Sequence, residues 1–225
     1  MGQKGEWMKQ QVIVVGLGRF GSAAARELNA LGHEVLAVDA DETVVNDIAP
    51  HVTHAVQADA SDEQALRAIG ADQFDTAIVA ISSALEASIF ATMALKRLGV
   101  PTVITKAATP LHGAILERIG ADRVVYPERE AGVDVAHTLT VPDVIDYIDF
   151  GPGHGIAKIR VPRHFVGRTL RELDLQARLK VTPLALRHGS EVTINPHRDQ
   201  RLEEGDELVL IGLDEQLAKV SADIK

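Results

Sequence analysis

The chain has 225 residues, of which 46% are hydrophobic and 24% charged, and its formal net charge is -9. This length predicts one or two domains with a real core, and the composition excludes extensive disorder. The negative charge argues against nucleic acid as a partner, and the absence of cysteine excludes disulfides, thiol catalysis and thiolate zinc sites.

The first part of the chain alternates between short β-branched runs and helix-forming segments. A strand at 11–15 (QVIVV) is followed by a glycine-rich turn and a helix over 22–31. Further strands are predicted at 33–38, 53–56, 76–81, 102–106 and 123–126, and further helices at 44–49, 62–69, 86–98, 111–119 and 128–139. This alternation predicts an α/β fold with a Rossmann-like parallel sheet over residues 1–142, covered by helices on both faces.

The alternation of predicted strands and helices ends in the last third of the chain. Residues 143–155 contain the turn-rich run FGPGHG and are predicted to form a crossover or hinge. Residues 156–225 predict a second, smaller α+β C-terminal domain with antiparallel strands. Its strands are expected at 156–161, 181–187, 191–195 and 207–212, and its short helix at 169–177.

A nucleotide-binding motif lies between the first strand and the first helix. Gly16, Gly18 and Gly21 form a G-x-G-x-x-G pattern, which makes a tight turn and lets the backbone approach a phosphate. Asp39 closes the second strand, where a carboxylate can accept both ribose hydroxyls and would repel a 2′-phosphate. Arg19, inside the motif, is either a surface side chain or a cation beside the terminal phosphates.

Signatures of catalysis do not accompany this motif. The sequence has no H-E-x-x-H, no G-x-x-x-x-G-K-[ST] and no Ser-His-Asp signature. The second domain also offers no evident acid, base or carboxylate clamp for a substrate. The combination predicts a nucleotide sensor rather than an enzyme, with a small NAD-dependent oxidoreductase as the alternative.

Several stretches resemble the KtrA/TrkA family, the regulatory subunits of bacterial potassium uptake systems. They are VVGLGRFGSAAARELNALGHEVLAVDADETVVNDI, THAVQADASDEQALRAIGADQFDTAIVAI, VITKA, LERIGADRVVYPERE, GRTLRELDLQARLKVTPLALRHG and LEEGDELVLIG. The resemblance covers nearly the whole chain. It implies RCK-type domains, which regulate the conductance of potassium, with ATP, ADP or NAD(H) bound in the N-terminal domain.

The resemblance also implies the roles of individual residues. The phosphate loop is implied to consist of Gly16, Gly18, Arg19, Phe20 and Gly21, and the ribose is implied to contact Asp39, Ala40 and Asp41. The residues implied to lie beside the adenine are Asp59 and Ala60, and those that face the sugar are Ile81, Ser82 and Ser83. Lys106, Ala107, Ala108 and His112 of the site follow the fifth strand, and Glu128 is implied to lie near the γ-phosphate and Mg²⁺. On spacing alone, Lys106 and His112 could be sheet-edge residues. Likewise, Glu128 and the Asp59 segment could serve only the starts of helices.

The family further implies partners and an assembly. Its members form dimers that assemble into an octameric ring on a potassium-translocating membrane subunit of the KtrB/TrkH type. We therefore expect a cytoplasmic homo-oligomer, peripheral to the membrane through its partner. A gating module of a potassium channel or a cation/proton antiporter is an alternative with nearly the same sequence. In some relatives the second domain binds cyclic di-AMP, for which Arg178 and the turn Asn195-Pro196-His197 are the candidates.

Overall fold

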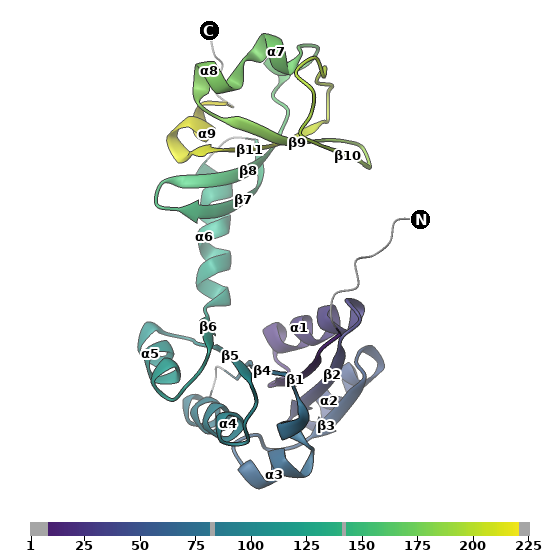
Figure 1. Cartoon of the computed structure of the whole chain (residues 1–225), viewed down its shortest axis with the longest axis vertical. Coiled ribbons are helices and arrows are strands. Elements are labelled where there is room, and N and C mark those ends of the chain that lie inside the picture. Colours follow the sequence, from purple (N-terminus) through teal and green to yellow (C-terminus); the bar gives the residue numbers. More distant parts are fainter. Residues whose placement is uncertain (1–8, 82–83, 141–142, 221–225) are drawn as a thin grey trace. The chain divides into compact units, whose positions relative to one another are not determined.

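The structure is a computed structural model that describes residues 9–81, 84–140 and 143–220. The chain divides into two compact units, Met1–Glu128 and Arg129–Lys225, each of which contains its own sheet (Figure 1). This division falls within α6 (Pro127–Thr140), whereas the sequence predicts a domain boundary at residue 142. The boundary at 142 stays a prediction.

The first unit is built on a six-stranded parallel sheet in the order β3-β2-β1-β4-β5-β6. The strands are β1 (Gln11–Val15), β2 (Glu34–Asp39), β3 (His54–Gln57), β4 (Thr76–Val79), β5 (Thr102–Lys106) and β6 (Arg123–Val125). Their order reverses between β1 and β4, and in sheets of this type ligands bind outside the carboxyl ends of the strands at such a reversal. The predicted Rossmann-like α/β fold is confirmed.

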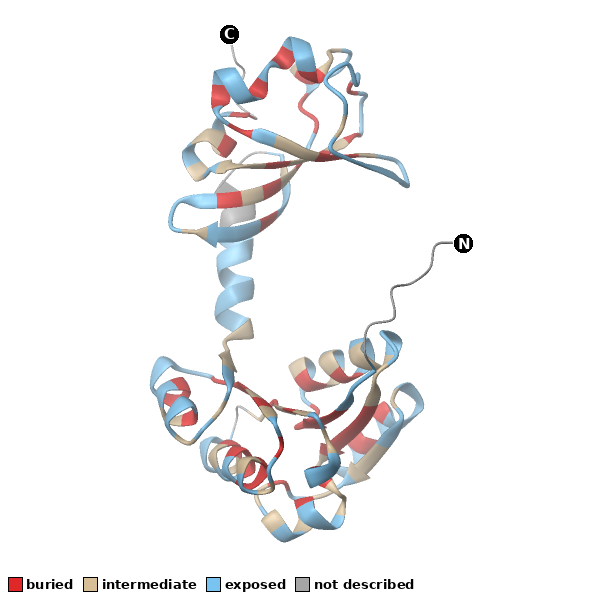
Figure 2. Cartoon of the chain, in the orientation of Figure 1, coloured by how far each residue is buried: buried red, intermediate tan, exposed pale blue. Residues whose placement is uncertain are grey.

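Helices cover both faces of this sheet because successive strand residues point to opposite sides. Ile13 and Val15 of β1 belong to one core and Val12 and Val14 to the other. The helices are α1 (Arg19–Ala30), α2 (Glu42–Ile48), α3 (Glu63–Ala68), α4 (Leu85–Arg97) and α5 (Pro110–Arg118), with short 3-10 turns η1 (Ala49–His51) and η2 (Ala71–Gln73). Figure 2 shows the central strands almost entirely buried.

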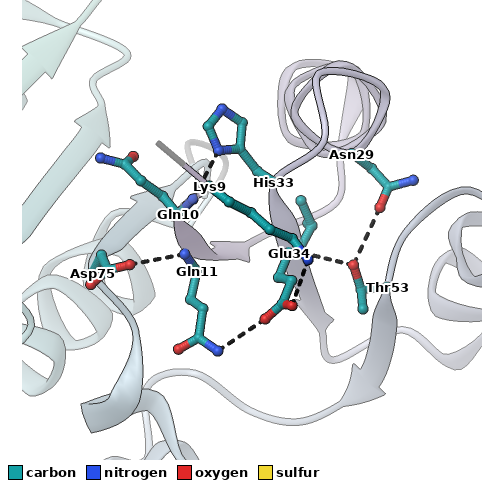
Figure 3. A network of polar contacts seen from close by, with 9 residues as sticks. Lys9, Gln10, Gln11, Asn29, His33, Glu34, Thr53 and Asp75 are labelled. Atoms are coloured by element: carbon teal, nitrogen blue, oxygen red, sulfur yellow. Dashed lines mark hydrogen bonds and ion pairs between the residues drawn. The ribbon is translucent and has the colours of Figure 1, made fainter. Parts of the chain in front are cut away.

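Polar side chains close the amino ends of the strands, at the opposite edge from the glycine turn. Asp75 Oδ2 accepts a hydrogen bond from the Gln11 amide at 2.9 Å, and Lys9 and Glu34 form an ion pair at 2.8 Å (Figure 3). Thr53 Oγ1 accepts from the Val35 amide at 3.0 Å. The bonds to the Gln11 and Val35 amides satisfy backbone donors near the starts of β1 and β2, so this edge has a structural role.

The second unit contains a five-stranded antiparallel sheet in the order β10-β9-β11-β8-β7. The strands are β7 (Val144–Gly151), β8 (His154–Arg160), β9 (Thr182–His188), β10 (Glu191–Ile194) and β11 (Glu207–Leu213). The helical segments are η3 (Arg163–Phe165), α7 (Leu170–Leu173), α8 (Leu175–Leu179) and α9 (Asp214–Val220). One core joins these elements through buried residues such as Phe165, Leu208 and Leu217, which confirms the smaller α+β domain.

The second unit differs from the sequence-based expectation in three places. Residues 144–151, predicted within a crossover or hinge, form β7, because Tyr147 is buried in the core and the hairpin turn to β8 is confined to Pro152 and Gly153. The helix predicted over 169–177 is divided at Asp174, which adopts a left-handed conformation with φ 43°. Helix α9 has no counterpart among the predicted elements. Among the residues that the structure describes, no helix has the length and apolar content that a membrane span requires.

Candidate functional site

The first unit contains a cavity of about 480 Å³ where the carboxyl ends of its strands meet. This volume is within the range typical of small-molecule sites. Eleven of the predicted site residues line it: Gly16, Gly18, Arg19, Phe20, Asp39, Ala40, Asp59, Ala60, Ile81, Lys106 and Glu128. They come from the carboxyl ends of different strands, from the turns that follow them and from the starts of helices. The fold, rather than sequence proximity, therefore brings them together.

The turn between β1 and α1 forms the floor of the cavity. Gly16 has φ +87°, and its amide donates to the Val38 carbonyl at 2.8 Å, which ties the turn to β2. A Cβ at Gly16 would lie 2.8 Å from Ile81 Cγ1, whereas a Cβ at Gly18 would have no heavy atom within 4 Å. Helix α1 then begins with no side chain capping its amides and no acidic residue in its first turn. These features favour an anion at the helix N-terminus.

Asp39 links the glycine turn to the end of β2. Its Oδ2 accepts from the Leu17 amide at 2.6 Å and its Oδ1 from the Asp41 amide at 3.0 Å. Each carboxylate oxygen can accept a second hydrogen bond, so Asp39 can orient the turn and still accept from two ligand hydroxyls. Its half-buried position keeps one side open to the cavity.

Asp41, by contrast, lies outside the cavity because its side chain has a local partner. Asp41 is the N-cap of α2, where its Oδ1 accepts from the Thr43 amide at 2.8 Å. Asp59 does line the cavity, after β3, and its Oδ1 accepts from both the amide and the hydroxyl of Ser61. These bonds lower the pKa of Asp59 below its ordinary value.

A buried lysine lies on the side of the cavity formed by β5 and α6. Lys106 Nζ contacts Glu128 Oε1 at 2.5 Å and lies 5.9 Å from the centroid of the Phe20 ring, within the range of a cation–π interaction. The Lys106 hydrogen bond is the main cause that lowers the pKa of Glu128, and a backbone hydrogen bond and the charge of Arg19 lower it further. Glu128 is therefore ionised at neutral pH.

Some of the predicted residues do not line the cavity. They are Gly21, Asp41, Ala107, Ala108 and His112, while Ser82 and Ser83 lie outside the described residues. His112 is buried on α5, its Nδ1 accepts from the Ala108 amide at 3.3 Å, and burial lowers its pKa. Gly21 packs α1 against the Gly16 carbonyl.

Six further apolar residues of the lining were not predicted from the sequence. Val15, Val38, Ala58, Ala80, Ala84 and Ala87 complete the wall. Three of them, Val15, Ala58 and Ala80, are the last residue of a strand or the residue just after one, a position that could have indicated them. Within the described part of the chain, no three His, Asp or Glu side chains gather as metal ligands, so Mg²⁺ at Glu128 stays a prediction.

The second unit has a smaller cavity of about 290 Å³ beside α7, α8 and β9. Arg171 and Arg198 are its cationic lining residues. Of the residues predicted for cyclic di-AMP, Pro196 lines this cavity, whereas Arg178, Asn195 and His197 do not. Binding of this ligand stays a prediction.

Comparison with protein families assigns both units. A TrkA-N domain matches residues 12–127 and a TrkA-C domain matches residues 156–225. Ktr system potassium uptake protein C of Bacillus subtilis (strain 168) is 38% identical over 205 residues, which are 91% of this chain and 93% of that protein. Protein A of the same system and organism is 38% identical over 208 residues, 92% of this chain and 94% of that protein.

A solved structure is similar to this chain over most of its length. The GsuK channel bound to NAD is 25% identical, with a TM-score of 0.52, over 95% of this chain and 38% of the channel chain. Because a TrkA-N domain precedes a TrkA-C domain, and because both B. subtilis relatives align over nearly their full lengths, the chain belongs to the KtrA/TrkA family.

Proposed function

We propose that this chain is a nucleotide-binding regulatory subunit that controls a potassium-translocating membrane protein. The observation that carries the proposal is the cavity of the first unit, in which a glycine turn, the N-terminus of α1, Asp39 and Lys106 converge. Membership of the family supports the link to potassium uptake. The ligand is ATP, ADP or NAD(H), and its exchange changes the conformation of the assembled protein.

The chemistry of the cavity supports a dinucleotide or an adenine nucleotide. The α1 amides and Arg19 provide positive potential for phosphates, and Asp39 provides two acceptors for a ribose. The GsuK channel, a structural relative, has a solved structure with NAD bound, which supports NAD(H) as a ligand here. A Mg²⁺ ion could be held by Glu128 together with ligand phosphates, because Mg²⁺ is often bound by one or two carboxylates plus phosphate oxygens.

The proposed assembly is a ring of dimers, eight chains in all, on the cytoplasmic face of a KtrB/TrkH-like membrane subunit. Large apolar side chains exposed on neighbouring elements support self-association: Val133 of α6 is 40% exposed, Ile148 of β7 58% and Phe150 of β7 66%. Light scattering at micromolar concentration should give a mass well above the 24.2 kDa of one chain. A clean monomer would contradict the ring.

The likeness to GsuK also supports a second candidate, the gating module of a potassium channel. The ligand site would serve both functions, and only the identity of the membrane partner separates them. A small NAD-dependent oxidoreductase is the enzymatic alternative. Turnover of NADH with carbonyl substrates by the purified protein would favour that alternative over a regulatory subunit.

Arg19 provides the test of the proposed ligand response. Arg19 is exposed at the first turn of α1 and lines the cavity, so we propose that it distinguishes the third phosphate of ATP. Arg19→Ala should lower the affinity for ATP about tenfold, towards that for ADP, and leave ADP binding within about twofold. Titration calorimetry on the ligand-stripped protein measures both.

Arg26 is the matched control, since it is exposed on the same helix and does not line the cavity. Arg26→Ala should leave both affinities unchanged. If Arg19→Ala kept the full difference between ATP and ADP, Arg19 would be a surface residue with no part in the response.

A further inference from the structure

We propose that Tyr126 is a positioning residue for the ligand site. Its ring, seated against Gly113 of α5, fixes the start of α6 and thereby holds Glu128 at the cavity. The inference rests on the proposed function, because Glu128 serves a ligand only if the cavity binds one. Tyr126 does not itself line the cavity, so it acts through Glu128.

The contact between Tyr126 and Gly113 leaves no room for a side chain on α5. Gly113 is buried, and Tyr126 is half-buried directly after β6. A Cβ added at Gly113 would collide with the Tyr126 hydroxyl oxygen and would lie 2.8 Å from Cζ of the ring. Glycine weakens a helix interior and the φ of Gly113 is not positive, so the room that it leaves for the ring accounts for its presence.

The part of α5 that contacts the ring is itself held in place. His112, the residue before Gly113, is buried, and its Nδ1 accepts from the Ala108 amide at 3.3 Å. The Ala107 amide donates to the Val125 carbonyl at 2.9 Å, which joins the loop after β5 to the end of β6. The start of α5 is therefore tied to both strands, and Gly113 offers the ring a fixed surface.

The start of α6 depends on such an anchor. Every residue of α6 from 128 to 136 is exposed in this chain, so the first turn gains little from the packing of its own side chains. Its direction is set by the residues at its start. Tyr126 supplies a ring held by α5, and Pro127, the first residue of the helix, has a φ restricted to about −65°.

Glu128 reaches the cavity from this first turn. Its Oε1 contacts Lys106 Nζ at 2.5 Å, and both residues line the cavity. Because the Glu128 side chain is 66% exposed, a small rotation of the first turn would carry its carboxylate away from the cavity. Mg²⁺ is often bound by one or two carboxylates together with phosphate oxygens, and loss of the contacts that orient such a carboxylate typically costs about 10- to 100-fold in metal affinity.

The test compares the wild type with Gly113→Ala, Tyr126→Leu and the double variant. Each is titrated with ATP by calorimetry, once in Mg²⁺ and once in EDTA. Either single substitution should lower the affinity for ATP in Mg²⁺ roughly tenfold, because Glu128 is no longer held at the cavity. The affinity in EDTA should not fall, because the α1 amides and Arg19 are unchanged. The double variant should resemble the single ones, since both substitutions remove the same contact.

Two control variants separate this contact from other effects. Tyr126→Phe keeps the ring against Gly113 and should retain most of the affinity in Mg²⁺. Gly132→Ala also replaces a helical glycine, within α6 itself, but its added Cβ would meet no heavy atom within 4 Å. Gly132→Ala should leave both affinities unchanged.

Hydrogen exchange followed by mass spectrometry measures the anchoring without any ligand. Peptides over residues 127–136 should exchange severalfold faster in Gly113→Ala and Tyr126→Leu, but not in Gly132→Ala, and thermal unfolding checks that each variant is folded. Unchanged exchange, unchanged affinity in Mg²⁺, an equal loss in Mg²⁺ and in EDTA, or additive losses in the double variant would refute the positioning role. If the wild type bound no nucleotide, the proposed function would fail, while the exchange data would still decide whether Tyr126 anchors α6.

Discussion

Replacing either Gly16 or Gly21 by alanine should lower the free energy of unfolding of the first unit by about 2 to 5 kcal/mol. At Gly16 the φ of +87° disfavours any side chain, and the new Cβ would lie 2.8 Å from Ile81 Cγ1. At Gly21 the new Cβ would collide with the carbonyl oxygen of Gly16, a backbone atom that cannot rotate away. Urea unfolding followed by circular dichroism measures both changes.

Gly18 provides the control within the same motif. Its φ is not positive, and an added Cβ would meet no heavy atom within 4 Å, so Gly18→Ala should cost less than about 1 kcal/mol of stability. Because Gly18 lines the cavity, the added methyl group should instead weaken the binding of phosphate-bearing ligands. If all three substitutions lowered the free energy of unfolding equally, steric exclusion of a side chain at Gly16 and Gly21 would not explain why these positions are glycine.

Asp39→Asn should weaken NADH binding roughly ten- to hundredfold. The substitution replaces one acceptor by an amide donor and removes a charge, and hydrogen bonds to charged groups contribute about 1.5 to 3 kcal/mol each. Wild-type protein should also bind NADPH more weakly than NADH, because the Asp39 carboxylate repels a 2′-phosphate, and Asp39→Asn should reduce this difference. Fluorescence titration with both dinucleotides measures the four affinities.

Asp62 is the matched control for Asp39. It is an N-cap carboxylate whose Oδ1 accepts from the Gln64 amide at 2.8 Å, and it does not line the cavity. Asp62→Asn should leave NADH binding unchanged. Unchanged affinity in Asp39→Asn, or equal wild-type affinity for NADH and NADPH, would remove Asp39 from the site.

Elements with a local signal could be predicted from the sequence. The β-branched runs, the glycine turn and the glycines that end helices placed all six strands of the first sheet within two residues at either end. The start of α1 was predicted at Ser22, whereas the helix begins at Arg19. The reason is that Gly21, a poor helix former, lies inside the first turn to allow close packing.

Features that depend on tertiary packing could not be predicted in the same way. Residues 144–151 form a strand because Tyr147 is buried against the core of the second unit. The segment VIDYIDFG is mostly apolar, but the turn-rich run at its end led to its placement in a hinge.

Asp39 and Asp41 are two residues apart, and the sequence gives no reason to treat the two carboxylates differently. In the structure the Asp41 carboxylate caps α2, whereas Asp39 lines the cavity. Lys106 and Glu128 are 22 positions apart in the sequence. They meet because Lys106 ends β5 and Glu128 follows β6, the strand that pairs with β5.

The most direct test of the central claim is potassium flux through a reconstituted membrane partner of the KtrB/TrkH type. The flux is measured in the presence of this protein, first with ATP and then with ADP. Vesicles containing the partner and the wild-type chain should show a flux that differs between ATP and ADP. The difference should be lost with Arg19→Ala and retained with Arg26→Ala. The same flux with either nucleotide and with none, at concentrations that saturate binding, would contradict a regulatory subunit controlled by this cavity.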